Sequence, residues 1–232
     1  MRDLITWHYA AQTEELAASV AFAALERGAG DHGFYDDFIA GVCRTHLQSP
    51  QIVAFLYSIA PPPAVVALRD NLLEELGSEG EPGHPELLRR LATAAGFGRS
   101  RLAGLERAAQ QDLRRAISTP MRLPSLRELG LSVMLEVIAF EWMLAQLAGR
   151  MGNALLRHRG IDREALAWFF HHAEVDVGHA TEGVEALLAY AGWYGLTEAD
   201  VARIAGLTFR ENAFLQRYFG DGSAPAAQEQ AA

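Results

Sequence analysis

Residues 131–149 read LSVMLEVIAFEWMLAQLAG, an apolar run long enough to cross a membrane, yet it carries Glu136, Glu141 and Gln146. Each acidic side chain at the centre of a bilayer would cost about 2.5–3.5 kcal/mol on insertion scales. We therefore expect this run to form a buried core helix and predict no contact with a membrane.

Outward from this run, apolar residues recur at helical spacing through nearly the whole chain, and no stretch alternates for long as a strand would. The pattern predicts an all-α, single-domain helical bundle over residues 1–222, followed by a flexible C-terminal tail at 223–232. A glycine-rich turn is expected at residues 77–83. The expected helices cover about residues 11–28, 33–46, 49–60, 62–77, 85–97, 100–117, 123–158, 163–193 and 197–219.

The composition of the 232-residue chain excludes several functions. Its formal net charge is −9 and its basic residues form no long run, which argues against nucleic acid as a partner. Cys43 is the only cysteine, so an internal disulfide and a cysteine-ligated metal cluster are excluded. The first residues, MRDLITWHYAAQ, lack the apolar segment of a signal peptide, and we expect a cytoplasmic protein.

Residues 168–180, WFFHHAEVDVGHA, carry the most informative polar pattern. At about 100° per residue, His172, Asp176 and His179 fall within an arc of about 60° on one helix face. Three potential metal ligands therefore point the same way. The alternative is a polar stripe that faces solvent.

Glu141 stands on a helix face that is otherwise apolar, with Val137, Ile138 and Leu144 as its neighbours. A buried, ionised carboxylate is costly unless it meets a cation or hydrogen-bond donors. A metal ion would meet this need, and a salt bridge to Arg69 is the structural alternative.

A third polar segment is NLLEELGSEGEPGHPELL at residues 71–88. Glu74 and Glu75 lie about 100° apart at the end of a predicted helix, so one of them is expected to face inward. His84 precedes Pro85 where the next helix opens. Taken alone, this segment is also typical of a soluble turn and a helix cap.

Together, the three segments supply carboxylates and histidines from separate helices, which is how helical bundles build dimetal sites. Oxygen and imidazole ligands without thiolate favour iron or manganese. Zinc-dependent hydrolysis is compatible with the ligand types, but six candidates exceed the needs of one catalytic zinc.

The order and spacing of these segments resemble the haem-oxygenase-like diiron oxidases and oxygenases, which share a wider fold with TenA and PqqC. The resemblance covers about residues 35–215 and rests on N-x-x-[DE]-E-x-G, H-P-x-L, an aromatic-flanked glutamate and H-x3-D-x2-H. Glu75 is preferred to Glu74 because it stands four residues after Asn71. The catalytic metal ligands that the resemblance implies are Glu75, His84, Glu141, His172, Asp176 and His179.

The resemblance further implies two Fe(II) ions, with manganese as an alternative metal, and O2 as co-substrate. The expected activity is oxidation of a small polar metabolite, such as an amino acid, amine or carboxylate, in a biosynthetic pathway. An external electron donor and a homodimer are expected by analogy. Aromatic residues are candidates for the pocket walls and arginines for binding a substrate carboxylate, although both types commonly have structural roles. The aromatic candidates are Phe140, Trp142, Phe169 and Phe170, and the arginine candidates are Arg69 and Arg157.

Two departures from the family pattern limit the chemistry. Residues 46–51 contain no carboxylate, whereas members that oxygenate an amine nitrogen often carry an additional ligand there. Met151 stands ten residues after Glu141, where some relatives have lysine. An N-oxygenase is therefore an alternative rather than the first choice. The others are a metal-free TenA-like or PqqC-like enzyme, for which nothing beside Cys43 indicates activation, and a non-catalytic binding or scaffold protein.

Overall fold

The computed structural model describes residues 1–78, 80–118 and 123–220, and leaves the side chains of residue 117 and residues 175–177 outside its description. The tail predicted at 223–232 lies outside the described residues, and the division into one domain and a tail stays a prediction. The helices are α1 (Arg2–Ala18), α2 (Val20–Arg27), α3 (His32–His46), α4 (Ser49–Ser58), α5 (Val65–Leu76), α6 (His84–Ala94), α7 (Arg99–Ser118), α8 (Leu126–Ala154), α9 (Ala167–Trp193), α10 (Glu198–Thr208) and α11 (Ala213–Phe219). A short 3-10 helix, η1 (Pro62–Ala64), and a π turn, η2 (Leu155–Arg159), precede α5 and follow α8.

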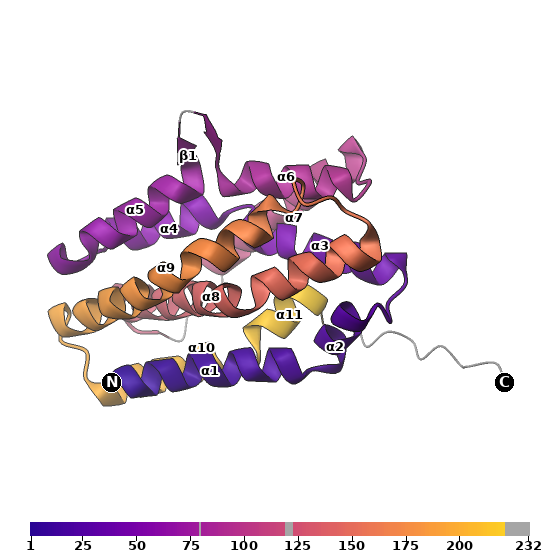
Figure 1. Cartoon of the computed structure of the whole chain (residues 1–232). Helices are drawn as coiled ribbons and strands as arrows, with labels where there is room; N and C mark the ends of the chain where they lie inside the picture. The colour runs from indigo at the N-terminus through magenta and orange to yellow at the C-terminus, as the bar shows by residue number, and fades with distance from the viewer. Residues whose placement is uncertain (79, 119–122, 221–232) are drawn as a thin grey trace.

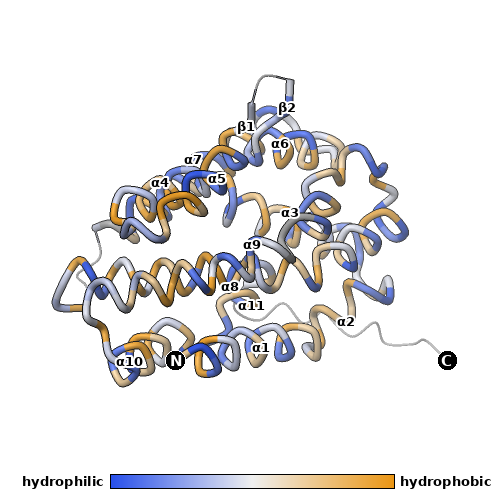
Figure 2. Tube along the Cα trace, turned by 60° about the vertical axis from the view of Figure 1, so that its left-hand side comes forward, coloured by the Kyte–Doolittle hydropathy of each residue, from blue (hydrophilic) through white to orange (hydrophobic). Residues whose placement is uncertain are grey.

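The long helices α8 and α9 form the centre of the molecule and contact each other more extensively than any other two elements do. Helices α4, α5 and α6 lie along one side of this pair, and α1 and α10 along the other (Figure 1). The hydrophobic residues of α8 run along its length between these layers (Figure 2). Leu131, Leu135 and Leu155 are fully buried there. The all-α bundle predicted from the sequence is confirmed.

Two glycines allow the close approach of other groups to α8. A Cβ atom at Gly183 of α9 would lie 2.9 Å from Ile138 of α8. On α8 itself, a Cβ atom at Gly130 would lie 2.2 Å from the hydroxyl of Tyr190. Real Cβ atoms do not make contacts this short, so each glycine fixes how closely its neighbours can pack.

The N-terminal helix differs from the expected one. The prediction of a single helix over residues 11–28 is wrong, because α1 already begins at Arg2 and the chain breaks at Ser19. Ser19 has extended backbone angles, and its hydroxyl accepts a hydrogen bond from the amide of Phe22 at 3.1 Å, which caps α2. The buried face of α1 includes Gln12 and Thr13, so an apolar count underestimates the helix.

The turn expected at residues 77–83 is a small hairpin. Strands β1 (Gly77–Ser78) and β2 (Glu81–Pro82) pair antiparallel, with Gly77 opposite Pro82 and Ser78 opposite Glu81. The hairpin joins the end of α5 to the start of α6.

The continuous helical stretch Leu126–Arg159 is long and apolar enough to span a membrane by length and composition, and 56% of its most apolar window is buried in the protein. The core helix of a soluble protein passes the same test, so this finding alone does not indicate a membrane span.

Candidate metal centre

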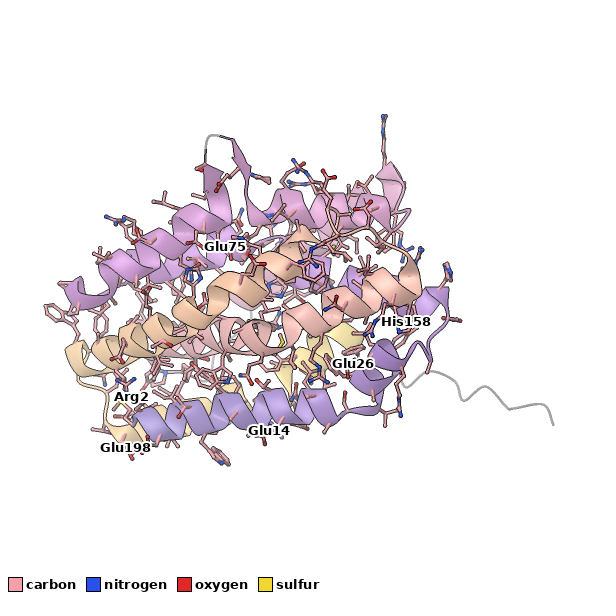
Figure 3. The ribbon with its side chains drawn as sticks, viewed as in Figure 1. Arg2, Glu14, Glu26, Glu75, His158 and Glu198 are labelled. Carbon is pink, nitrogen blue, oxygen red and sulfur yellow. The ribbon has the colours of Figure 1, made fainter. Side chains whose placement is uncertain are left out.

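Four helices bring the predicted ligands toward one region of the bundle. Glu75 comes from the end of α5, His84 from the start of α6, Glu141 from α8, and His172 and His179 from α9. Figure 3 shows Glu75 between α5 and α9. Asp176 belongs to α9, but its side chain lies outside the described residues.

Three of these side chains form a buried series. Glu75, His84 and His172 are only 8%, 7% and 5% exposed. Oε2 of Glu75 lies 3.1 Å from Nδ1 of His84, and the rings of His84 and His172 lie 4.6 Å apart between centroids. The hydroxyl of Ser49 donates a hydrogen bond to Glu75. One carboxylate and two imidazoles therefore meet in the core.

The orientation of His172 is fixed by its own helix. Nδ1 of His172 lies 2.7 Å from the carbonyl oxygen of Trp168, one turn earlier. The carbonyl can only accept, so Nδ1 carries the hydrogen and Nε2 of the neutral ring keeps its lone pair. Burial, followed by the nearby charge of His84, lowers the pKa of His172 well below its usual value. A neutral imidazole held by a backbone carbonyl has the form that a metal requires.

Glu74 also faces this region, which corrects the expectation that only one of the two adjacent glutamates would. Oε1 of Glu74 lies 3.3 Å from Nε2 of His179. Helix α5 packs against both α6 and α9, so side chains about 100° apart at its end each find a histidine, Glu75 on α6 and Glu74 on α9. Oε2 of Glu74 is buried and has no hydrogen-bond partner among the described residues.

Glu141 lines a small cavity between α5, α8 and α9. The amide of Asn71 donates a hydrogen bond to Oε1 of Glu141. The cavity has a volume of about 20 Å³, room for about one water, and His179 and Glu182 also line it. Arg69, the alternative partner for this carboxylate, is half exposed and pairs with Asp70 at 2.7 Å. Burial and then the negative charge of Glu141 raise the pKa of Tyr9 well above its usual value.

The sequence of residues 36–205, which includes all four of these helices, matches the model of a family described as iron-containing redox enzymes. This chain belongs to that family. It is also 29% identical over 128 residues to a protein named 4-aminobenzoate synthase from Chlamydia pneumoniae, an alignment that covers 54% of this chain and 55% of that protein. The chain thus spans about half the length of this relative. The predicted family is confirmed, and with it an iron-binding redox enzyme.

The chemistry of the donor set suits the iron that the family implies. Neutral imidazole and carboxylate oxygen are ligands of iron, and the unpaired oxygen of Glu74 is an acceptor that a cation would satisfy. Within the described side chains, however, no three His, Cys, Asp or Glu residues are arranged around one point as metal ligands. The predicted ligands instead contact one another, as Glu75–His84–His172 and beside the pair Glu74–His179.

The aromatic residues considered as pocket walls do not line this cavity. Phe140 packs edge-on against Phe214, and Phe169 stacks with Phe38. Both belong to the core, together with the partly buried Trp142 and Phe170 that pack against it. The cavity walls are aliphatic instead, formed by Val53, Leu56, Ala67, Leu68, Val137, Ile138 and Ala186. Arg157 is exposed on the π turn and donates to the carbonyl of Asn153.

Sequence reasoning missed three side chains beside the candidate ligands. Ser49 and His46 lie in the segment that stood out only for its lack of a carboxylate, and Trp168 resembled any buried aromatic residue. His46 hydrogen-bonds Tyr218, with 2.7 Å between Nε2 and the hydroxyl oxygen. Burial, followed by the positive charges of Arg217 and His84, lowers the pKa of His46 to about 3. The serine at the start of α4 and the histidine at the end of α3 were the only available signals.

Proposed function

We propose that this protein is a non-haem diiron enzyme that uses O2 to oxidise a small polar metabolite. The observation that carries the proposal is the buried series of Glu75, His84 and His172, which joins three helices inside the segment matched by the family model. Carboxylates and neutral imidazoles are rarely buried together without a function, because each loses its hydration.

The residues that would hold two iron ions are those implied by the resemblance: Glu75, His84, Glu141, His172, Asp176 and His179. Glu74 adds a seventh donor through its contact with His179. Ferrous ions bound there would supply electrons for the reduction of O2, and manganese is the alternative metal.

The protein's own part in this chemistry is positioning. The carbonyl of Trp168 holds the ring of His172, the amide of Asn71 holds Glu141, and the hydroxyl of Ser49 holds Glu75. Such supporting hydrogen bonds fix the direction of each ligand's lone pairs. The aliphatic walls beside Glu141 exclude bulk water from the reacting groups.

The substrate class in this proposal is an amino acid, amine or carboxylate of a biosynthetic pathway. The relative named 4-aminobenzoate synthase supports it, since the product in that name carries both an amino and a carboxylate group. Ser49 stands where N-oxygenating members often carry a carboxylate ligand, which leaves N-oxygenation as the second choice. A cytoplasmic enzyme, a separate electron donor, a homodimer, and the absence of nucleic-acid and membrane partners remain parts of the proposal.

Anaerobic loading with ferrous iron tests the proposal directly. We expect about two iron ions per chain and O2 uptake by the loaded protein. Glu75→Gln should lower the iron content, whereas Glu86→Gln, which changes an exposed glutamate one turn into α6, should leave it unchanged. Less than about one iron per chain together with no O2 uptake would refute the diiron function.

A further inference from the structure

A continuous path of stacked rings leads from His172 into the core on the side away from Glu75. The indole of Trp168 lies 4.2 Å from the ring of His172 between centroids, and His46 lies 4.9 Å from Trp168. Tyr218 completes the path, with its ring 5.7 Å from that of His46. These residues come from α9, α3 and α11, so the fold, rather than one local segment, assembles them.

The end of the path is a hydrogen-bonded tyrosine–histidine pair. The hydroxyl oxygen of Tyr218 lies 2.7 Å from Nε2 of His46, and the two side chains' residues are 1% and 9% exposed. Oxidation of a phenol makes its proton strongly acidic, so a buried tyrosine gives up an electron readily only when a base stands ready for the proton. Nε2 of His46 is such a base.

We propose that Trp168, His46 and Tyr218 form a redox relay, in which Tyr218 passes one electron through Trp168 to the iron site and its phenolic proton to His46. The proposal rests on the diiron function, because the oxidant is the iron site after O2 has oxidised it. Each step between neighbouring rings is short, and His172 connects the indole to the metal.

The relay step balances in electrons and protons. The O–H bond of Tyr218 breaks, the proton binds Nε2 of His46, and the electron reduces the iron site by one unit. Tyr218 becomes a neutral phenoxyl radical beside a histidinium. A one-electron donor then restores the phenol, and His46 returns the proton.

The tyrosine end of the relay lies close to the protein surface. Arg217, the neighbour of Tyr218 on α11, is about half exposed and lines an open surface pocket with Glu136 and Gln216. Its positive charge also reaches His46. An external one-electron donor that binds at this surface would therefore meet the relay rather than the iron site itself.

Freeze-quench electron paramagnetic resonance tests the relay. Protein loaded with ferrous iron is mixed with O2 in the absence of substrate, and we expect an organic radical whose signal narrows when tyrosine is ring-deuterated. Tyr218→Phe should abolish this signal while iron content and O2 uptake persist. Trp168→Phe should lower the radical yield several-fold, again with iron retained.

Tyr9→Phe is the matched control. Tyr9 is fully buried and senses the charge of Glu141, but its hydroxyl has no hydrogen-bond partner among the described residues. It should leave the radical unchanged. A tyrosyl signal that survives in Tyr218→Phe, or iron-loaded protein that consumes O2 without forming one, would overturn the relay alone. Failure to bind iron and to consume O2 would overturn the diiron function and the relay together.

Discussion

Replacing His46 by phenylalanine should reduce the acid sensitivity of the metal-free protein. The folded state keeps His46 neutral because its pKa is about 3, whereas the same side chain in the unfolded chain takes up a proton near its ordinary value of about 6.5. The unfolded state therefore binds more protons as the pH falls below that value, and the free energy of unfolding decreases. From about pH 7.5 to about pH 5.5, one such group costs about 1.4 kcal/mol.

Urea unfolding at these two pH values measures the effect. The decrease in unfolding free energy should be about 1.4 kcal/mol smaller in His46→Phe than in the wild type. His172 contributes in the same direction in both proteins, so the difference isolates His46. Tyr218→Phe is the control, because it removes the same hydrogen bond but keeps the buried imidazole, and its pH dependence should match that of the wild type. An equal decrease in His46→Phe and the wild type would refute the assignment of a buried, neutral His46.

Three further outcomes are expected. Gly130→Ala should destabilise the protein by about 1–3 kcal/mol in urea unfolding, since its Cβ would meet the Tyr190 hydroxyl, while Gly206→Ala, with nothing within 4 Å, should not. Equal stabilities would contradict that packing. Asn71→Ala should weaken iron binding about 10- to 100-fold, measured by competition with a chelator, because Glu141 loses its amide donor. The exposed Leu73→Ala on the same helix is its control, and unchanged affinity in Asn71→Ala would argue against this support. Cys43 is buried with its pKa raised to about 12, so a thiol reagent should react with it slowly in the native protein and rapidly in urea. Fast native labelling would contradict that environment.

Much of the fold follows from helical periodicity because most helices here bury one apolar face. The core helix α8 was predicted at residues 123–158 and occurs as α8 and η2, from Leu126 to Arg159. Helix α1 was misplaced because Gln12 and Thr13 occupy buried positions on its inner face. Asn212 of the α10–α11 connection donates to the carbonyl of Gln12, and such a long-range partner leaves no trace in the local pattern.

The candidate site was predictable where its residues share one helix and less so where tertiary packing decides. The spacing of His172 and His179 on α9 placed both in the site region, and the side chain of Asp176 lies outside the described residues. The choice between Glu74 and Glu75 depended on which helices flank the end of α5, and both glutamates reach a histidine. The roles of Ser49 and Trp168 depend on contacts across helices, which sequence spacing does not encode.

The hairpin between α5 and α6 separates the length of the connecting loop from the position of the ligands it joins. Glu75 stands two residues before the paired Gly77, and His84 two residues after Pro82, so the pairing sets the span between them. Residues added to or removed from the tip would lengthen or shorten the strands without moving their base. Relatives can therefore differ in the number of residues between the two ligands and still place both alike, which gives evolution a segment of free length beside a site of fixed geometry.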